Sequence, residues 1–569
     1  MLGLSNASGM FDISGTMWLV GMMFVYGLKS IWLPWLWPVF NQIFLMVYLS
    51  AWLRRSNVTT GAEWIGTRFG YGRGAELSHN VVVAFALIAC LGFLAYGFIG
   101  LGKFIEVFIP WEVVSQYVPF QISPDFVPHF YGIVFTAFAV FYAILGGMTG
   151  IVWTDLLQYV IMTISSVFIG IMAMNALSDH TLFVPDGWRS PFFGVHLGID
   201  WKEIIPEVNK KIASDGYSLF SLFFGIMLFK GILVSAAGPS PNLDMQKIFS
   251  TKNPREASLM SGFVSVILNP VRYFFIAGLA ILGILFYNQL DLLVGGEVDF
   301  EQILPSVINE FIPVGLMGLV MAGLLAAFNS TFAGTLNAGQ AYILNDIVLK
   351  YIKPDASNRQ IRYINYGTGL LLVAVSVIFG LFARNINSVL MWIVSGLWGG
   401  YTAANVIKWY WWRFNGHGYF WGMFTGVGVA LIAPRILPSL LPAIPEEIVL
   451  LYFFPVLLLL SVVGCVAGTF ARPPTDEGIL MDFYKQVRPW GFWKPIHEKV
   501  IKENPDFKKN TGFARDMFNI FFGIIAQTAL VALPVFIVLK AGNWIILTIV
   551  TILITGIILK KSWYDKLEA

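Results

Sequence analysis

Apolar runs of 20 or more residues recur along almost the whole chain, and they constrain its fold more than any other feature. Each run is long enough to cross a hydrocarbon core of roughly 30 Å as a helix. Only 12% of the 569 residues are charged and 57% are hydrophobic, whereas an ordinary soluble domain carries about 25% charged residues. A soluble fold cannot bury that much apolar surface, so we predict an all-α membrane protein of about 14 transmembrane helices. The predicted spans lie near 1–28, 30–53, 79–108, 128–149, 152–177, 217–238, 257–287, 312–349, 361–383, 387–412, 418–440, 447–470, 516–540 and 543–559.

The loops between these runs indicate the orientation, because Lys and Arg are retained on the cytoplasmic side of a membrane. With alternating spans, the basic segments 54–73, 247–255 and 350–362 all fall on one side. The loop 291–310 holds five acids and no Lys or Arg, and it falls on the other side. We therefore predict a multi-pass protein of an inner or plasma membrane, with the polar segment 472–515 in the cytoplasm.

The composition also argues against several functions. The net charge is only +3, and Lys and Arg are spread over short loops and not gathered in one patch, which argues against nucleic acid as a partner. Cys90 and Cys465 lie in apolar runs and give neither a disulfide framework nor a metal-ligand spacing. We find no nucleophile, base or metal constellation at membrane depth, so we expect neither an enzyme nor a cofactor. The sequence does not indicate an oligomeric state, and a monomer would be sufficient.

The first and sixth apolar runs contain residues that break helices. Residues 5–15 (SNASGMFDISG) combine small and polar side chains with the carboxylate of Asp12. Residues 235–242 include Pro239 and Pro241, which lack an amide donor. Paired interruptions in two halves of a transporter point to its binding site, because freed carbonyl oxygens can coordinate a cation. The alternative interpretation is a pair of plain kinks.

The eighth run carries Ala327, Ser330, Thr331 and Gly334 at i, i+3, i+4 and i+7, which places them on one face of a helix. Two hydroxyls, together with carbonyls of a broken neighbouring helix, would supply the oxygens that a dehydrated sodium ion needs. The same stripe is typical of close helix packing with local hydroxyl hydrogen bonds. The residues alone leave both interpretations open.

Three ionisable residues at membrane depth are further candidates for function. Asp12 lies in the first interruption, and Arg272 lies well inside an apolar run. We favour pairing of Arg272 with an acid over binding of an anionic solute. Asp155 follows Gly146 and Gly147, where it either caps a helix N-terminus or binds an ion.

Three segments resemble signatures of the sodium:solute symporter family, which includes sodium/glucose, sodium/proline and sodium/sialic acid transporters. They are residues 146–158 (GGMTGIVWTDLLQ), residues 244–257 (DMQKIFSTKNPREA) and residues 329–346, which begin Asn-Ser-Thr. The resemblance covers nearly the whole chain. It implies a LeuT-like core of two inverted five-helix repeats, sodium-driven alternating access and a solute site near the membrane midplane.

The resemblance also implies a division of the chain. It places the first repeat (helices 1 to 5) at 1–177, an extracellular loop at 178–216, the second repeat (helices 6 to 10) at 217–413, peripheral helices 11 and 12 at 414–471, a cytoplasmic loop at 472–515, and helices 13 and 14 with a tail at 516–569.

The family's main sodium site is carried over residue by residue. Ser330 and Thr331 match its hydroxyl ligands, and the backbone carbonyls of Met10, Ile13 and Ala327 would complete it.

Asp155 matches the acid of a second sodium site found in some members. The two further hydroxyl positions of that site read Ala333 and Gly334 in this chain. We therefore expect one sodium ion per cycle.

The solute is less clearly indicated. The run from Asp12 to Gly15 is similar to the broken first helix of the proline symporter. The polar residue and aromatic gate of the sugar transporters fall near Val234 and Ala237, so sugar transport is not supported. We expect no counterpart of the helix that precedes the repeat in this family, because the nine residues before the break supply roughly 13 Å of helix. The candidate solute-binding residues are Asp12, Ser14, Gln42 and Arg272.

These observations together predict sodium-coupled symport of a small polar organic solute by alternating access. A proton-coupled symporter that uses Asp12 or Asp155 is the nearest alternative. A solute sensor without transport is a second alternative, although no signalling domain follows the last span.

Overall fold

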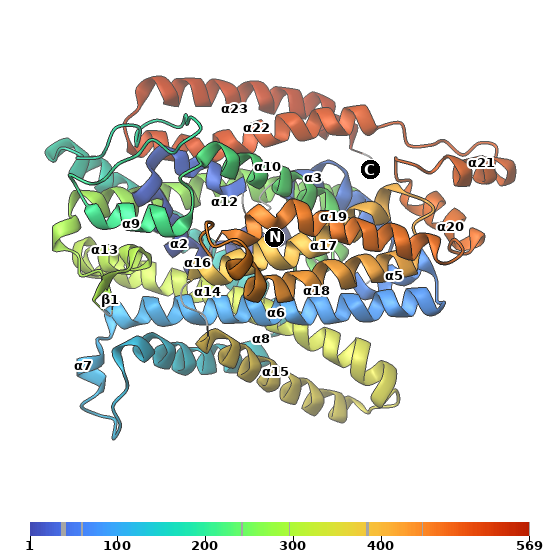
Figure 1. The fold of residues 1–569 in the computed structure, drawn as a ribbon, viewed down its shortest axis with the longest axis horizontal. Helices are drawn as coiled ribbons and strands as arrows, with labels where there is room; N and C mark the ends of the chain where they lie inside the picture. The colour runs from blue at the N-terminus through green and yellow to red at the C-terminus, as the bar shows by residue number, and fades with distance from the viewer. Residues whose placement is uncertain are drawn as a thin grey trace.

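Long helices run along the long axis of the molecule (Figure 1). Figure 1 shows a computed structural model, which describes residues 1–35, 41–58, 61–239, 243–294, 296–382, 386–446 and 448–567. Within these ranges the strands are β1 (Leu293–Val294) and β2 (Glu297–Val298), which form one small antiparallel hairpin. The described part of the chain is therefore helical, as its apolar runs predict.

The helices divide into three groups along the chain. The segment expected to form the first repeat contains α1 (Leu2–Gly9), α2 (Ile13–Tyr26), η1 (Gly27–Trp35), α3 (Asn41–Phe44), η2 (Leu45–Leu49), α4 (Ser50–Arg55), α5 (Gly61–Phe69), α6 (Arg73–Phe108), α7 (Trp111–Val114), η3 (Pro124–Phe126) and α8 (Val127–Asp179). The following loop and second repeat contain α9 (Pro206–Asp215), α10 (Phe220–Ala237), α11 (Leu243–Phe249), α12 (Pro254–Leu285), η4 (Tyr287–Gln289), η5 (Phe300–Gln302), α13 (Ile303–Phe311), α14 (Val314–Ala341), η6 (Tyr342–Ile352), α15 (Asn358–Leu381), α16 (Ile386–Met391), η7 (Trp392–Leu397) and α17 (Trp398–Tyr410). The C-terminal part contains α18 (Gly416–Leu440), α19 (Val449–Phe470), α20 (Glu477–Val487), α21 (Lys494–Glu503), α22 (Phe513–Val538), α23 (Gly542–Ser562) and η8 (Tyr564–Lys566).

Twelve helical segments among the described residues are long and apolar enough to cross a membrane. The two other predicted spans, near 30–53 and 387–412, are built from consecutive shorter pieces. The pieces α3, η2 and α4 form one stretch, and α16, η7 and α17 form the other, each with a π-helical turn in its middle. Such turns interrupt the regular ladder and often occur at functional sites.

Both predicted interruptions are present. Helix α1 ends at Gly9, and α2 begins at Ile13 with Asp12 as its N-cap. Helix α10 ends at Ala237, and Gly238 follows with φ +90°, a left-handed conformation that favours glycine. Helix α11 resumes at Leu243, while residues 240–242 lie outside the described residues. The interpretation as plain kinks is therefore wrong for the first span, because three non-helical residues separate its halves.

Two predicted spans lie within one continuous helix. The sequence predicts spans near 128–149 and 152–177, and the structure has candidate spans at Pro124–Phe141 and Val152–Asp179, the second of them wholly inside the 53 residues of α8. At 1.5 Å per residue α8 measures about 80 Å, more than twice the thickness of a hydrocarbon core, so it contains both spans. Gly146 and Gly147 keep their amide donors, and a glycine pair therefore does not end a helix as a proline would.

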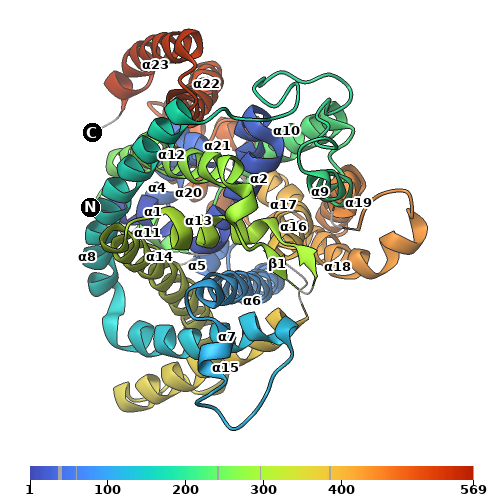
Figure 2. The same cartoon turned by 90° about the vertical axis from the view of Figure 1, so that its left-hand side faces the viewer.

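Helix α2 lies at the centre of the bundle. Each of its 14 residues is buried, in keeping with a sequence that is apolar on every side. The loop before α9 covers its C-terminal end, where the indole N–H groups of Trp188 and Trp201 donate to the carbonyls of Phe24 and Val25. An end-on view shows α2 surrounded by other helices, with α22 and α23 at one edge and α18 and α19 at another (Figure 2).

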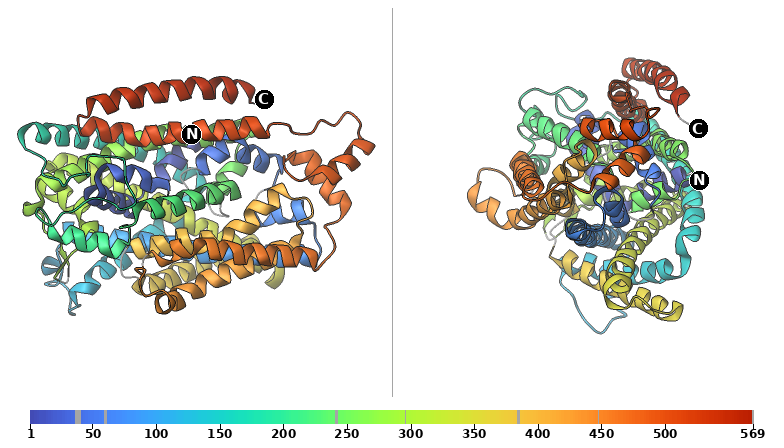
Figure 3. Two further views of the ribbon diagram at one scale, coloured as in Figure 1. Left: turned by 45° about the horizontal axis from the view of Figure 1, so that its top comes forward. Right: turned by 90° about the vertical axis from the view of Figure 1, so that its right-hand side faces the viewer.

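The segment 472–515 folds beyond the ends of the spans as α20 and α21 (Figure 3). Arg68 of α5 is fully buried beneath it and donates to the carbonyls of Lys408, Trp411 and Phe414 at the end of α17. Its guanidinium also lies 4.9 Å from the ring centroid of Trp493. Burial lowers the pKa of Arg68 to about 9, and the three carbonyls hold its charged form.

Candidate cation and solute sites

A cavity of about 230 Å³ lies between the two helix breaks. Its walls come from both halves of the first span, from α3, α6, α11, α12 and α14, and from α17 and α22. All four candidate solute residues line it, namely Asp12, Ser14, Gln42 and Arg272. Met10, Ile13 and Thr331, predicted for the sodium site, line it as well. The structure thus brings the two predicted sites to one place.

The hydroxyl face of α14 meets the break in the first span. The hydroxyl of Thr331 donates to the carbonyl of Gly9 over 2.6 Å. The oxygen of Ser330 lies 3.9 Å from the point where a Cβ on Gly9 would stand. Ala327 on the same face is fully buried. The stripe of small and hydroxyl residues therefore packs against irregular backbone, which is the arrangement that the sodium interpretation requires.

Asp155 joins α8 to this region. Its Oδ2 accepts a hydrogen bond from the Ser5 hydroxyl over 2.5 Å, and Ser330 also hydrogen-bonds to its carboxylate. Its Oδ1 has no hydrogen-bond partner among the described residues, and the residue is fully buried. Asp155 lies in the interior of α8, so the alternative role as a helix N-cap is wrong. That interpretation rested on a helix boundary after Gly147 that the fold does not have.

Lys247 of α11 approaches the same region, although its sequence position indicated only a basic loop. The side chain is buried, and its Nζ lies 4.0 Å from the point where a Cβ on Gly9 would stand. It also interacts electrostatically with Asp155. A fixed cation therefore lies at the edge of the candidate sodium site and partly compensates the carboxylate.

The solute candidates cluster around the start of α2. The carboxylate of Asp12 accepts from the amide of Gly15 over 2.7 Å and pairs with Arg272 Nη2 at 3.2 Å. The hydroxyl of Ser14 donates to the carbonyl of Tyr96 over 3.0 Å. The predicted pairing of Arg272 with an acid is confirmed, and Asp12 is its partner.

Gly15 allows three side chains to converge at this point. A Cβ on Gly15 would stand 2.8 Å from Asp12 Oδ1, 2.8 Å from the Tyr96 hydroxyl and 2.9 Å from Arg272 Nη2. Tyr96 was not among the sequence candidates, because a single Tyr in an apolar run is typical of an interfacial or core residue.

A second polar group in the cavity comes from outside the expected core. Gln527 of α22 is buried and accepts a hydrogen bond from Ser265 of α12 over 3.3 Å. One turn further along α12, Asn269 donates to the backbone carbonyl of Ser265 over 3.0 Å. All three residues line the cavity. The one sequence signal for Gln527 was an amide within an otherwise apolar run, and α22 was assigned to the C-terminal helices outside the two repeats.

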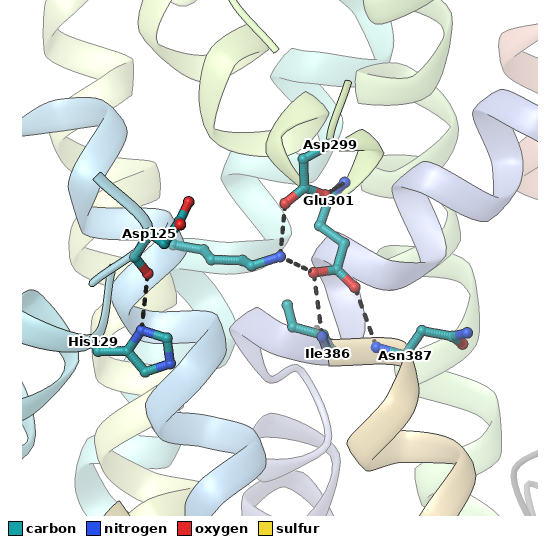
Figure 4. A network of polar contacts seen from close by, with 7 residues as sticks. Asp125, His129, Asp299, Glu301, Ile386 and Asn387 are labelled. Atoms are coloured by element: carbon teal, nitrogen blue, oxygen red, sulfur yellow. Dashed lines mark hydrogen bonds and ion pairs between the residues drawn. The ribbon is translucent and has the colours of Figure 1, made fainter. Parts of the chain in front are cut away.

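A network of charges joins the acidic loop 291–310 to α6 and α16 (Figure 4). Lys103 of α6 pairs with Asp299 at 2.7 Å and with Glu301 at 2.5 Å. The carboxylate of Glu301 accepts from the amides of Ile386 and Asn387 at the start of α16. Asn387 in turn accepts from the indole of Trp18 on α2 over 3.0 Å. The acidic loop, which the sequence used only as a marker of orientation, thus connects α6, α16 and α2.

A family model described as the sodium:solute symporter family matches residues 2–426. The chain belongs to the sodium:solute symporter family. Among its relatives, the sodium/glucose cotransporter 4 of Danio rerio is 24% identical over 511 residues, which are 83% of this chain and 71% of that protein. The sodium/glucose cotransporter of Vibrio parahaemolyticus is 24% identical over 350 residues, which are 58% of this chain and 62% of that protein.

The fold is also found in a solved relative. A Na⁺-coupled sialic acid symporter in a substrate-bound outward-open state aligns with a TM-score of 0.55 and 15% identity, over 83% of this chain and 90% of that chain. The chain therefore has the LeuT-like helical fold and is a multi-pass membrane protein of a plasma-membrane transporter family, not an enzyme.

Proposed function

We propose that this chain couples the entry of sodium to the uptake of a small polar organic solute by alternating access, with one sodium ion per cycle. The observation that carries the proposal is the contact between the hydroxyl face of α14 and the broken first span, beside a cavity. Backbone polar groups cannot find water in the lipid, so non-helical backbone at membrane depth occurs only where it is buried in protein or lines a cavity.

The proposed sodium site has five oxygens. They are the carbonyls of Met10, Ile13 and Ala327 and the hydroxyls of Ser330 and Thr331. A hydroxyl that donates a hydrogen bond to a neighbour still has oxygen lone pairs that can coordinate a cation. The hydrogen bonds from Thr331 to Gly9 and between Ser330 and Asp155 therefore leave both oxygens able to face a cation. Asp155 contributes negative charge close by without having to be a ligand.

The proposed stoichiometry of one sodium ion rests on two positions of α14 that follow Thr331. Ala333 and Gly334 are buried and carry no oxygen in their side chains. One charge moving through 100 mV contributes about 2.3 kcal/mol, and a tenfold sodium gradient adds about 1.4 kcal/mol. One sodium per cycle then supports an accumulation of a few hundredfold, whereas two would support about 10⁵-fold. The steady-state solute ratio in vesicles distinguishes the two.

The cavity indicates the chemistry of the solute. The buried amide oxygens of Asn41 and Gln42 and the Nε of Arg272 have no hydrogen-bond partner among the described residues. A buried polar atom without a hydrogen bond costs free energy. Binding would therefore be favourable for a solute that donates hydrogen bonds to the two amide oxygens and accepts one from Arg272. The Asp12–Arg272 pair has no net charge, which favours a neutral or zwitterionic solute over a bare anion.

Known relatives suggest which solutes to test first. The matched proteins are named as glucose, mannose, myo-inositol and sialic acid transporters. Val234 lines the cavity where a polar residue was expected for a sugar transporter. Polyols, amino acids and acidic sugars therefore belong in the same screen as hexoses.

Reconstituted vesicles test the proposed coupling. We expect uptake of at least one solute from this screen to be driven by an inward sodium gradient and not by an equal potassium gradient. Equal uptake in sodium and potassium would contradict sodium coupling, and uptake driven by a pH gradient alone would favour the proton-coupled alternative. Sodium-dependent solute binding without uptake would identify a sensor instead.

A further inference from the structure

A second pocket, of about 330 Å³, lies at the cytoplasmic end of the molecule, apart from the solute cavity. Four chain segments that the charge rule assigns to the cytoplasm meet there: the end of α4, the start of α12, the segment 488–516 and the tail after α23. Seven cationic side chains line it, namely Arg55, Arg255, Arg488, Lys508, Lys509, Arg515 and Lys566.

The negative charge among the described lining residues is much smaller. Asp516 is the one carboxylate in that lining. It already accepts from the indole of Trp490 over 3.0 Å, and Arg515 lies 3.6 Å away. The pocket therefore has a large excess of positive charge over the described residues, whereas the chain as a whole carries only +3.

The pocket also has hydrogen-bond donors at its base. Ser258 of α12 is 1% exposed, and its hydroxyl has no partner among the described residues. Gly512 places the N-terminus of α22 in the wall, and no side chain caps it. The start of α12 is in the wall as well, but Asn253 caps it. The N-terminus of a helix carries a partial positive charge and free amide donors, which suit an anion.

We propose that this pocket binds a phosphate group. Basic pockets between transmembrane helices on the cytoplasmic side bind anionic headgroups, and several Lys and Arg side chains with helix N-termini fit the three-oxygen face of a phosphate. The phosphate comes either from the headgroup of an anionic lipid or from a soluble phosphate in the cytoplasm. Trp563 also lines the pocket, and its indole donates to the carbonyl of Met46. Tryptophan is enriched at the level of the lipid headgroups, so its presence fits a headgroup site.

The test compares two triple variants with the same change of charge. Lys508→Gln/Lys509→Gln/Lys566→Gln removes three exposed cations of the pocket. Lys350→Gln/Lys353→Gln/Arg359→Gln removes three exposed cations of another cytoplasmic loop. One arm measures retention of phosphatidylglycerol and of phosphatidylcholine by native mass spectrometry. The other arm measures the shift of the thermal midpoint with inorganic phosphate and with chloride at equal ionic strength.

We expect the full chain and the loop variant to bind alike, and the pocket variant to bind at least tenfold more weakly, since each cation near an anionic surface is worth about fivefold. A loss confined to phosphatidylglycerol identifies a lipid site, and a loss confined to phosphate identifies a soluble ligand. Equal binding by all three proteins in both arms, or equal losses in both variants, would overturn the proposal.

Ser258→Ala provides a second measurement that does not change the charge. It removes one hydroxyl from the base of the pocket and should weaken binding in the arm that responded, with no loss of thermal stability in the ligand-free protein. Unchanged binding by this variant, together with unchanged binding by the pocket variant, would exclude a site in the pocket. Neither measurement depends on transport, so both are independent of the proposed function.

Discussion

A single glycine decides how the solute candidates are arranged. Gly15 lies where Asp12, Arg272 and Tyr96 approach the start of α2, and a methyl group there would stand within 3 Å of all three side chains. These contacts are with the ends of flexible side chains. We therefore expect the Gly15→Ala protein to fold, and the Asp12–Arg272 pair to be displaced.

We predict that Gly15→Ala reduces uptake of the transported solute at least tenfold and leaves sodium binding within about twofold, because the substitution lies on the solute side. Gly225→Ala in α10 is the control, since nothing lies within 4 Å of the added methyl group. Uptake and equilibrium sodium binding by both variants are the measurements. Normal uptake by Gly15→Ala would show that the cluster has no part in solute handling.

Residue patterns predicted one part of the site well and another part poorly. Ser330 and Thr331 share a helix face, and the break near Gly9 was visible in the residue types, so their meeting was predictable. Tyr96 and Lys247 were missed, because their contacts join segments that are far apart along the chain. Neither residue type is unusual at its own position, and only the fold shows that both face the first span.

At the scale of elements, α22 contributes to the cavity although it was expected to lie outside the two repeats. It lies beyond the matched family segment 2–426, yet it packs against α12 and places Gln527 in the cavity wall. The C-terminal helices are therefore part of the structure around the solute.

We predict that Gln527→Leu weakens solute binding about tenfold, because it replaces an amide in the cavity wall and leaves Ser265 without its acceptor, at a cost of about 1–3 kcal/mol. Thr528→Val is the matched control, since that hydroxyl bonds within its own helix to Ile524. Solute-induced thermal shift, with sodium present, measures both. Equal shifts for Gln527→Leu and the unchanged protein would place Gln527 outside the solute site.

The network around Glu301 joins α6, α16 and α2, and we expect it to restrict access to the cavity from the outside. Glu301→Gln removes the charge that pairs with Lys103 and caps α16, a buried pair whose loss costs about 3 kcal/mol or more. We predict a lower thermal midpoint and faster modification of Cys90, which lines the cavity, by an impermeant thiol reagent added from outside. Cys465, which is buried in α19, reports on global unfolding within the same sample.

Glu310→Gln is the control for this network, because Glu310 belongs to the same acidic segment 291–310 but is exposed at the end of α13. It should leave both the thermal midpoint and the rate at Cys90 unchanged. Identical rates at Cys90 in all three proteins would mean that the Glu301 network does not restrict access to the cavity.

Element boundaries were predictable where a residue removes a backbone donor or favours an unusual conformation, and not elsewhere. The second break, with Gly238 and Pro239, followed from the sequence for this reason. The continuity of α8 through Gly146 and Gly147 did not, because the decision between a bend and a helix end depends on packing against α6, α12 and α14. The π-helical turns η2 and η7 likewise have no signature in their apolar residues.

For the whole molecule, the distribution of charge predicts the topology. Loop residues next to α7 lie at the end opposite to α20 and α21 (Figure 1). We predict that Tyr117→Cys, at an 83% exposed position, is labelled by an impermeant thiol reagent on intact cells. Lys494→Cys, with a side chain 87% exposed, should be labelled only after the membrane is opened. Labelling of both positions on intact cells would contradict the predicted orientation.

The central claim for the whole molecule is that one cation binds between the broken first span and the hydroxyl face of α14. Equilibrium binding of radioactive sodium to the purified protein tests it without knowledge of the solute. Ser165→Ala/Ser166→Ala provides the control, because it removes an adjacent pair of buried hydroxyls from α8. We predict that Ser330→Ala/Thr331→Ala raises the sodium dissociation constant at least tenfold, about 1.4 kcal/mol or more, while the control stays within about twofold. An unchanged constant in Ser330→Ala/Thr331→Ala would contradict the account.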